Sequence, residues 1–208
     1  MDERLPRLVF IMGVQRSGTN ALFHSLAGSA DHAYNEANSS VLFDRFYLRP
    51  DAEVRDAISR LTGTVLVKPI SETKRRSVAA VLEAYADFRP ETVWTYRDPA
   101  ACFASHIERW VGFRGQPEAF AAEWCERNQS ALDALRAADS RIRLVRYEEM
   151  AIAPRLVRRL GEDLEMKARS RYRSLRAKGR RDLDFETIRV IERQTSDTLM
   201  ALDAARFR

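Results

Sequence analysis

The stretch LVFIMGVQRSGTN, residues Leu8–Asn20, joins an apolar run to a turn bounded by two glycines. Its first part, Leu8–Met12, is continuously apolar, which is typical of a parallel strand buried on both faces. After the turn, apolar residues recur at helical spacing up to Leu26, and Gly28 closes the pattern. The stretch therefore predicts a strand, a glycine-bounded turn and a helix in succession.

The rest of the chain repeats this alternation of strands and helices. Three later segments are rich in β-branched and aromatic residues and predict strands: Thr64–Val67, Thr92–Tyr96 and Ile142–Tyr147. Helical patterns cover Ala52–Leu61, Arg75–Asp87, Ala100–Val111, Pro117–Ala138 and Phe185–Leu202. We therefore expect an α/β fold of the P-loop nucleotide-binding type, with a mainly parallel central sheet and helices on both faces. No repeat or composition break divides residues 1–208, so we expect a single domain.

The composition of the chain indicates which kinds of partner it binds and in which compartment it is found. The chain of 208 residues carries a net charge of +5 with a pI near 9.5, which indicates an anionic partner such as a nucleotide, a nucleic acid or a membrane surface. Cys102 and Cys125 are too far apart for a metal-binding pair and too few for a disulfide framework. Because no apolar run approaches the ~20 residues of a membrane span, and Leu8–Met12 is too short for a signal peptide core, we expect a soluble, cytoplasmic protein.

The turn itself has the chemistry of an anion site. Gly13 and Gly18 lie five residues apart between a strand and a helix, where successive backbone N–H groups can cradle a phosphate. In nucleotide triphosphatases, Lys follows the second glycine and a Ser or Thr then holds magnesium. Thr19 and Asn20 occupy those places here, and the positive charge is at Arg16, whose planar guanidinium can fork onto two oxygens. The turn predicts phosphate binding without magnesium-dependent triphosphate hydrolysis.

Four segments resemble the sulfotransferase family. Gln15–Thr19 is similar to its 5′-phosphosulfate loop, and Trp94–Pro99 with Ser105 resembles its 3′-phosphate segment, in which a strand ends in Arg and Ser follows eight residues later. Val145–Met150 is similar to the family's Tyr-Glu-Asp-Leu segment, and Arg176–Gly179 resembles a gapped form of its Arg-Lys-Gly loop. The matches occur in the family's order and cover most of the chain.

The resemblance implies a donor and its binding residues. The donor would be 3′-phosphoadenosine 5′-phosphosulfate (PAPS), leaving 3′-phosphoadenosine 5′-phosphate (PAP), with no metal required. The acceptor would be a hydroxyl or amine on an unidentified small molecule, carbohydrate or peptide, and no nucleic-acid partner is expected. The residues implied to bind the donor are Gly13, Arg16, Ser17, Gly18, Thr19, Asn20, Arg97, Ser105, Tyr147, Lys178 and Gly179.

Two cations are candidates for stabilising the reaction. Arg16 would bridge the leaving phosphate oxygen. Lys68 ends the second of the predicted strands, at a place similar to the family's strand-end lysine, and would touch the transferring group from the other side. Sulfuryl transfer requires alignment of the attacking and leaving oxygens and stabilisation of the spreading charge, which cations provide.

A general base must also reach the acceptor. Cytosolic members of the family carry His shortly after the strand-end lysine, but Pro-Ile-Ser follows Lys68. Glu36, twenty residues after Arg16, resembles the position of the catalytic Glu in the tyrosylprotein and carbohydrate sulfotransferase branches, and is our hypothesis for the base. His32 is the alternative base. His106 lies on a predicted helix and is expected to have a packing role.

Two rival functions stay open at this point. A P-loop kinase of a small molecule or nucleoside would use ATP and magnesium, with Asp98 after a strand as the metal-holding carboxylate. A nonenzymatic nucleic-acid-binding protein would use the basic segment Arg155–Arg181. Acceptor pockets depend on variable loops; the candidates here are Asn38–Pro50, which carries three aromatic residues, and Gly112–Gln116 as a lid.

Overall fold

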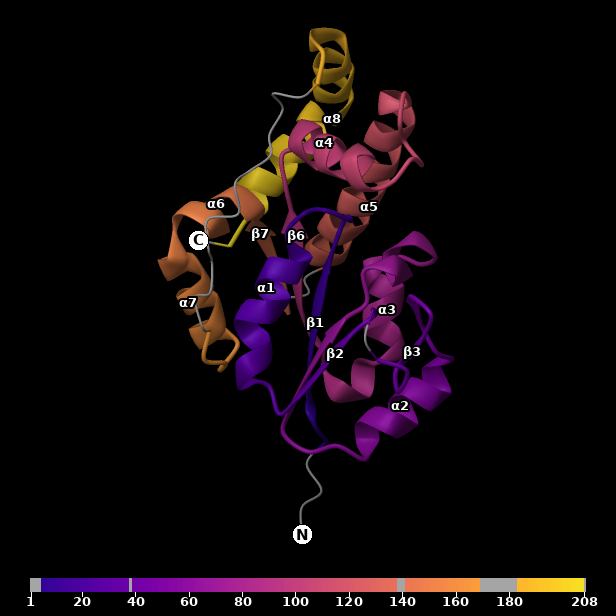
Figure 1. The fold of residues 1–208 in the computed structure, drawn as a ribbon. Helices are drawn as coiled ribbons and strands as arrows, with labels where there is room; N and C mark the ends of the chain where they lie inside the picture. Colours follow the sequence, from indigo (N-terminus) through magenta and orange to yellow (C-terminus); the bar gives the residue numbers. More distant parts are fainter. Residues whose placement is uncertain (1–4, 38, 138–140, 169–182, 208) are drawn as a thin grey trace.

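The structure is a computed structural model that describes residues 5–37, 39–137, 141–168 and 183–207 (Figure 1). Five parallel strands form the central sheet in the order β2-β5-β1-β6-β7. Their bounds are β1 Arg7–Gly13, β2 His32–Asn35, β5 Thr64–Lys68, β6 Glu91–Tyr96 and β7 Ile142–Arg146. The predicted α/β fold with a parallel sheet is confirmed.

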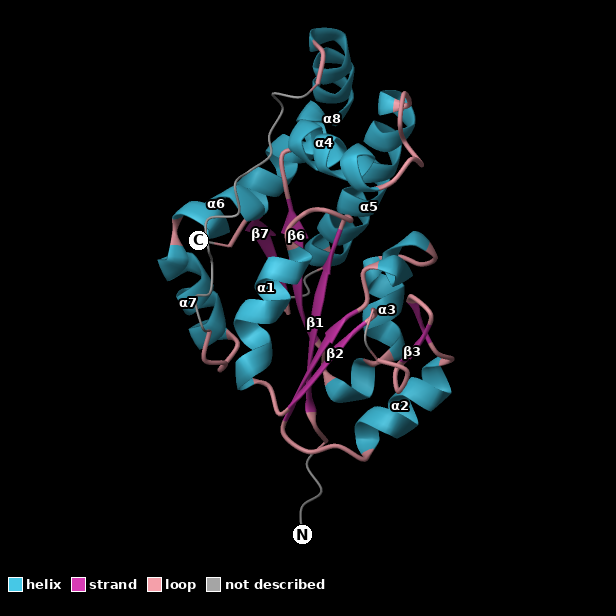
Figure 2. Cartoon of the chain, in the orientation of Figure 1, coloured by secondary structure: helices cyan, strands magenta, loops and turns pink. Residues whose placement is uncertain are grey.

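Helices cover both faces of this sheet (Figure 2). Because side chains alternate along a strand, Val9 and Ile11 of β1 pack on one face while Leu8, Phe10 and Met12 pack on the other. The first face is covered by α1 (Thr19–Leu26), α6 (Tyr147–Ile152) and α7 (Pro154–Asp163). The second is covered by α2 (Asp51–Ser59), α3 (Val78–Ala84), α4 (Pro99–Arg109), α5 (Pro117–Arg136) and α8 (Phe185–Ala205).

The predicted strands and the longer helices lie within a few residues of the observed ones, but two elements differ. The predicted helix Arg75–Asp87 is shorter, because Ser77 caps α3 and its side chain accepts a hydrogen bond from the backbone N–H of Ala80 at 3.1 Å. The last predicted strand ends at Arg146, and Tyr147 opens α6 instead. The basic segment begins with a regular helix, α7.

The segment before α2 contains strands that the sequence does not reveal. β2 has only four residues and pairs with β5 alone, at the edge of the sheet. β3 (Phe43–Asp44) and β4 (Tyr47–Leu48) form a hairpin with two-residue strands. Such short strands depend on distant partners and carry little periodic signal of their own.

The topology brings the functional candidates to one edge of the sheet. In a parallel sheet all carboxyl ends lie at the same edge, where open α/β folds bind ligands. The segments that follow β1, β2, β5 and β6 all leave from this edge. None of the described helices is both long and apolar enough to cross a bilayer.

Candidate active site

The turn after β1 is packed tightly against the end of β6. A Cβ atom at Gly13 would lie 2.4 Å from the carbonyl oxygen of Thr95 and 2.6 Å from its hydroxyl, so only glycine fits there. The Ser17 hydroxyl lies 2.9 Å from the Thr95 hydroxyl, and both residues are buried. The turn is therefore held by β6, the strand that leads to Arg97.

The second glycine allows an equally close contact on the other side of the turn. Gly18 has a φ of 97°, and a Cβ atom there would lie 2.1 Å from Cδ2 of Tyr147. Gly18 is also the residue before α1, so the N–H groups of the first helical turn open toward the glycine turn. Arg16, inside the turn, has a φ of 71°, a conformation that costs energy for a residue with a side chain. The turn is thus a conformationally constrained segment, and the N–H groups at the start of α1 make its surroundings electropositive.

Four residues implied to bind the donor meet at this turn. Arg16 Nε donates a hydrogen bond of 2.9 Å to the Ser105 hydroxyl, which α4 presents from its second turn. Arg97, directly after β6, donates from Nη1 to the Arg16 carbonyl at 3.4 Å, and its guanidinium lies 4.9 Å from the centre of the Tyr147 ring. Segments about eighty residues apart therefore converge on one place.

The electrostatics of this place favour an anion. Burial lowers the pKa of Arg16, and the nearby Arg109 and Arg97 lower it further. Positively charged guanidinium groups therefore repel one another in a partly buried site, and a bound anion would offset this repulsion. The Cys102 thiol donates to the Gln15 carbonyl at 3.1 Å, and burial raises the pKa of this thiol to about 12, so it supports the turn as a neutral group.

A second cluster lies at the ends of β2 and β5. Asn35, the last residue of β2, pairs with Lys68, the last residue of β5, so Glu36 follows immediately beside Lys68. Lys68 Nζ lies 3.9 Å from Glu36 Oε1, and the other Glu36 oxygen accepts a hydrogen bond of 2.9 Å from the Ser71 N–H. Burial lowers the pKa of Lys68, while the Glu36 carboxylate opposes that shift. The structure thus brings together the residues implied to be base and cation.

Arg127 of α5 joins the two clusters, and the sequence analysis did not identify it. It is 4% exposed. Its Nη2 donates to the carbonyl oxygens of Gly13 at 3.2 Å and Ile70 at 3.1 Å, and its Nη1 lies 3.1 Å from Glu123. The signal was present in the sequence, because Arg127 lies on the same helical face as the buried Trp124 and interrupts an apolar stripe.

The remaining predicted residues lie as follows. Thr19 is buried at the start of α1, whereas Asn20 is exposed. Tyr147 is 6% exposed and packs beneath Gly18 and Arg97, so its ring contacts the turn. Lys178 and Gly179 lie outside the described residues.

The alternative base, and the residues expected for a kinase or a nucleic-acid-binding protein, either lie away from the site or have structural partners. His32 begins β2, at the opposite end of that strand from Glu36. His106 packs against the rings of Trp110, Phe113 and Phe120. The Asp98 carboxylate caps α4 by accepting from the Ala101 N–H at 2.8 Å. The exposed arginines of α7 lie on its solvent side, since its apolar residues pack on the sheet.

The chain is similar in structure to solved sulfotransferase structures, including an olefin synthase domain and STF9. No protein-family model and no curated protein matches the chain. The sulfotransferase domain of the olefin synthase from Synechococcus PCC 7002 aligns with a TM-score of 0.48 and 17% identity, over 96% of this chain and 94% of that domain. The sulfotransferase STF9 from Mycobacterium avium aligns with a TM-score of 0.49 and 14% identity, over 93% of this chain and 69% of that protein. Likenesses at these TM-scores do not show what this chain does.

Proposed function

We propose that this protein is a sulfotransferase that moves a sulfuryl group from PAPS to a hydroxyl or amine acceptor. The observation that carries the proposal is the contact of Arg16 with Ser105 and of Arg97 with the Arg16 backbone. These contacts bring the turn expected to hold the 5′-phosphosulfate next to the pair expected to hold the 3′-phosphate. One nucleotide with phosphates at both ends of its ribose can therefore span them.

In this proposal the donor is held by N–H groups and cationic side chains, without a metal ion bound to carboxylates of the protein. The turn and the N-terminus of α1 offer N–H groups to the 5′-phosphate. Arg16 would leave its hydrogen bond with Ser105 and fork onto the phosphosulfate, which frees the Ser105 hydroxyl for the 3′-phosphate beside Arg97. Tyr147, packed under both Gly18 and Arg97, would keep the two anion sites at a fixed separation.

Transfer then proceeds between the two clusters. The acceptor oxygen or nitrogen attacks sulfur while the bond from sulfur to the phosphate oxygen breaks. The acceptor proton passes to Glu36, and Arg16 stabilises the charge on the departing phosphate. Lys68 faces Glu36 at 3.9 Å and would offset charge on the transferring oxygens. Arg127 sets the spacing of the clusters because it bonds both the turn and the segment after Lys68.

The kinase reading gains no support from the site. A magnesium-dependent kinase needs a free carboxylate near the turn, and the Asp98 carboxylate is engaged as the cap of α4. Thr19, at the place of the phosphate-binding lysine, is buried at the start of α1.

Nucleotide selectivity tests this function directly. Isothermal titration calorimetry should show PAP binding more tightly than adenosine 5′-phosphosulfate, which lacks the 3′-phosphate, and more tightly than ATP with magnesium. Arg97→Gln should weaken PAP about 10- to 100-fold, the worth of a hydrogen bond to a charged group, and leave adenosine 5′-phosphosulfate nearly unchanged. Arg136→Gln, on the exposed end of α5, is the matched control. Tighter binding of ATP with magnesium, or an equal loss for both nucleotides, would contradict the proposal.

A further inference from the structure

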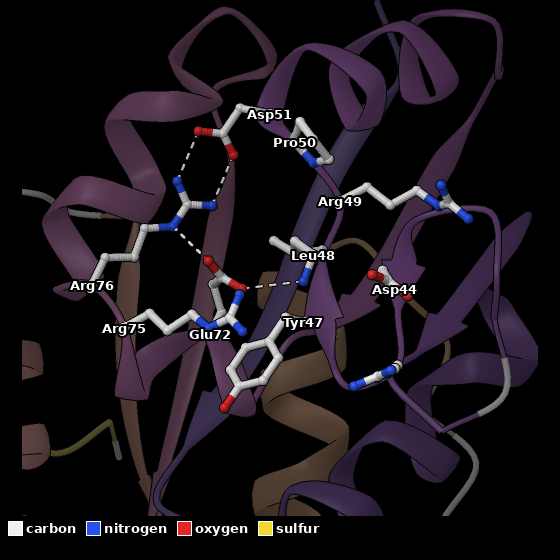
Figure 3. A pocket seen from close by; sticks show the side chains of 10 residues that line it. Asp44, Tyr47, Leu48, Arg49, Pro50, Asp51, Glu72, Arg75 and Arg76 are labelled. Atoms are coloured by element: carbon white, nitrogen blue, oxygen red, sulfur yellow. Dashed lines mark hydrogen bonds and ion pairs between the residues drawn. The ribbon is translucent and has the colours of Figure 1, made fainter.

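A cavity of about 560 Å³ lies between the hairpin before α2 and the segment that follows β5 (Figure 3). It is bounded by the β3–β4 hairpin, the start of α2 and the segment from η2 (Ser71–Lys74) to α3. Pockets for small molecules commonly measure about 300–1,000 Å³. The cavity therefore has room for a drug-sized molecule or a sugar unit.

One wall of the cavity belongs to the segment that binds the proposed base. The Ser71 N–H donates to Glu36, and the next residue, Glu72, lines the cavity. The second oxygen of Glu72 accepts a hydrogen bond of 3.1 Å from the Leu48 N–H, which fixes the hairpin to the same segment. Two adjacent residues thus connect the base to the cavity wall.

Two of the three acidic residues that line the cavity form ion pairs with the same arginine. Arg76 forms two hydrogen bonds of 2.8 Å with Asp51 and an ion pair of 2.9 Å with Glu72, as Figure 3 shows. The lining contains four arginines and three acidic residues, Asp44 being the third acid. The cavity therefore has an excess of positive charge after this network is formed.

Two of these arginines remain available to a ligand. Within the described part of the chain, neither Arg45 nor Arg75 has an acidic partner, and both side chains are exposed. The guanidinium of Arg75 lies 3.2 Å from the centre of the Tyr47 ring, which holds it at the cavity (Figure 3). A stacked guanidinium keeps its N–H edge free to bind a planar or tetrahedral anion.

The backbone of the hairpin supports a role for Arg45. Arg45 occupies the tip of a two-residue turn with a φ of 56°, where glycine or asparagine is usual. Such conformations are concentrated at ligand-binding sites, because function there compensates for the strain. Phe46 follows with 58% of its surface exposed, so the tip presents both a cation and an apolar ring.

We propose that this cavity binds the anionic group of an acidic acceptor through Arg45 and Arg75, and so directs the acceptor's hydroxyl or amine toward Glu36. The proposal rests on the sulfotransferase function and adds the class of acceptor: a small molecule or sugar that bears a carboxylate or sulfate. An anion here relieves the excess positive charge of the lining. A neutral acceptor of the same shape gains no such contact.

Inorganic sulfate is the first probe of the cavity. With the protein saturated by PAP, a sulfate titration followed by nuclear magnetic resonance should shift the backbone signals of Arg45, Tyr47 and Arg75 in a saturable way. Arg75→Gln should weaken this response at least about 10-fold, the worth of one charged hydrogen bond. Arg60→Gln, on the exposed end of α2, is the matched control and should leave it unchanged. Absent shifts, or a response that survives Arg75→Gln, would overturn the proposal.

A matched pair of organic probes tests the selection of acids. 4-Hydroxyphenylacetate should shift the same signals at lower concentration than its neutral amide, and Arg45→Gln together with Arg75→Gln should abolish the difference. Equal responses to acid and amide, or none to either, would overturn the acceptor class. PAP affinity is measured on the same samples. Lost PAP binding with an intact sulfate response would contradict the sulfotransferase function instead, so the two failures are distinguishable.

Discussion

The two halves of the site are built by different means. At the ends of β1 and β6, the proposed donor half consists of a backbone turn that packs so closely on Thr95 and Tyr147 that a Cβ atom at Gly13 or Gly18 would lie only 2.4 Å or 2.1 Å from them. Beyond the ends of β2 and β5, the proposed acceptor half consists of charged side chains, held by the ion pair of Glu36 with Lys68 and by those of Arg76 with Asp51 and Glu72. Small steric changes should therefore disable the donor half, whereas changes of charge should disable the acceptor half.

Removing the proposed base gives the largest expected effect and acts on the acceptor half alone. Glu36→Gln keeps an oxygen for the Ser71 N–H but cannot take a proton, so PAP release from PAPS, with water or 4-hydroxyphenylacetate attacking, should slow about 10²- to 10⁴-fold. PAP affinity, measured by calorimetry, should stay within about 2-fold. Glu118→Gln, exposed in the first turn of α5, is the control. An unchanged rate would remove Glu36 from this role.

Arg127→Lys tests whether the halves depend on one another. Lysine keeps the charge but lacks the planar fork that reaches the Gly13 and Ile70 carbonyls together, so both PAP affinity and turnover should fall about 10-fold or more. Stability to urea should drop by about 2 kcal/mol, since buried carbonyls lose their donors. Arg136→Lys, exposed on the same helix, should change neither property. A loss of stability with normal affinity and turnover would limit Arg127 to a structural role.

The contrast between the halves also explains what the sequence could predict. The donor half is encoded locally: the apolar run, the glycines and Arg16 are consecutive, and Arg97 with Ser105 forms a second short motif. The acceptor half depends on pairings between distant residues, such as Asn35 with Lys68 and Leu48 with Glu72. Those pairings create β2 and the hairpin, and neither has a periodic pattern of its own.

Gly18→Ala breaks the donor half by steric means. The new Cβ would lie 2.1 Å from the Tyr147 ring at a φ of 97°, so we expect about 1–3 kcal/mol lower stability and weaker PAP binding. Two matched variants separate the causes. Gly115 has a φ of 73° but no atom near its added Cβ, so Gly115→Ala tests the backbone conformation alone. Gly112 has neither a positive φ nor a close neighbour, so Gly112→Ala is the control for adding a methyl group. Calorimetry with PAP should show a loss for Gly18→Ala alone, and an equal loss in all three would contradict the role of the Tyr147 contact.

The smallest expected effect is a dependence of stability on pH that arises beside the donor half. Burial lowers the pKa of His106, with help from the cations Lys74, Arg16 and Arg127, while Glu123 opposes the shift. The folded protein therefore keeps His106 neutral at a pH where the unfolded chain, near its ordinary value of 6.5, already binds a proton.

Because the unfolded chain then holds more protons, the free energy of unfolding should decrease as pH falls from 6.5 to the lowered pKa of His106 and change no further on its account below that. Urea unfolding at a series of pH values measures this, and His106→Gln should flatten that part of the curve relative to the wild type. His24→Gln, on the exposed side of α1, should keep the wild-type slope. If His106→Gln also keeps it, the protonation of this histidine is not coupled to folding.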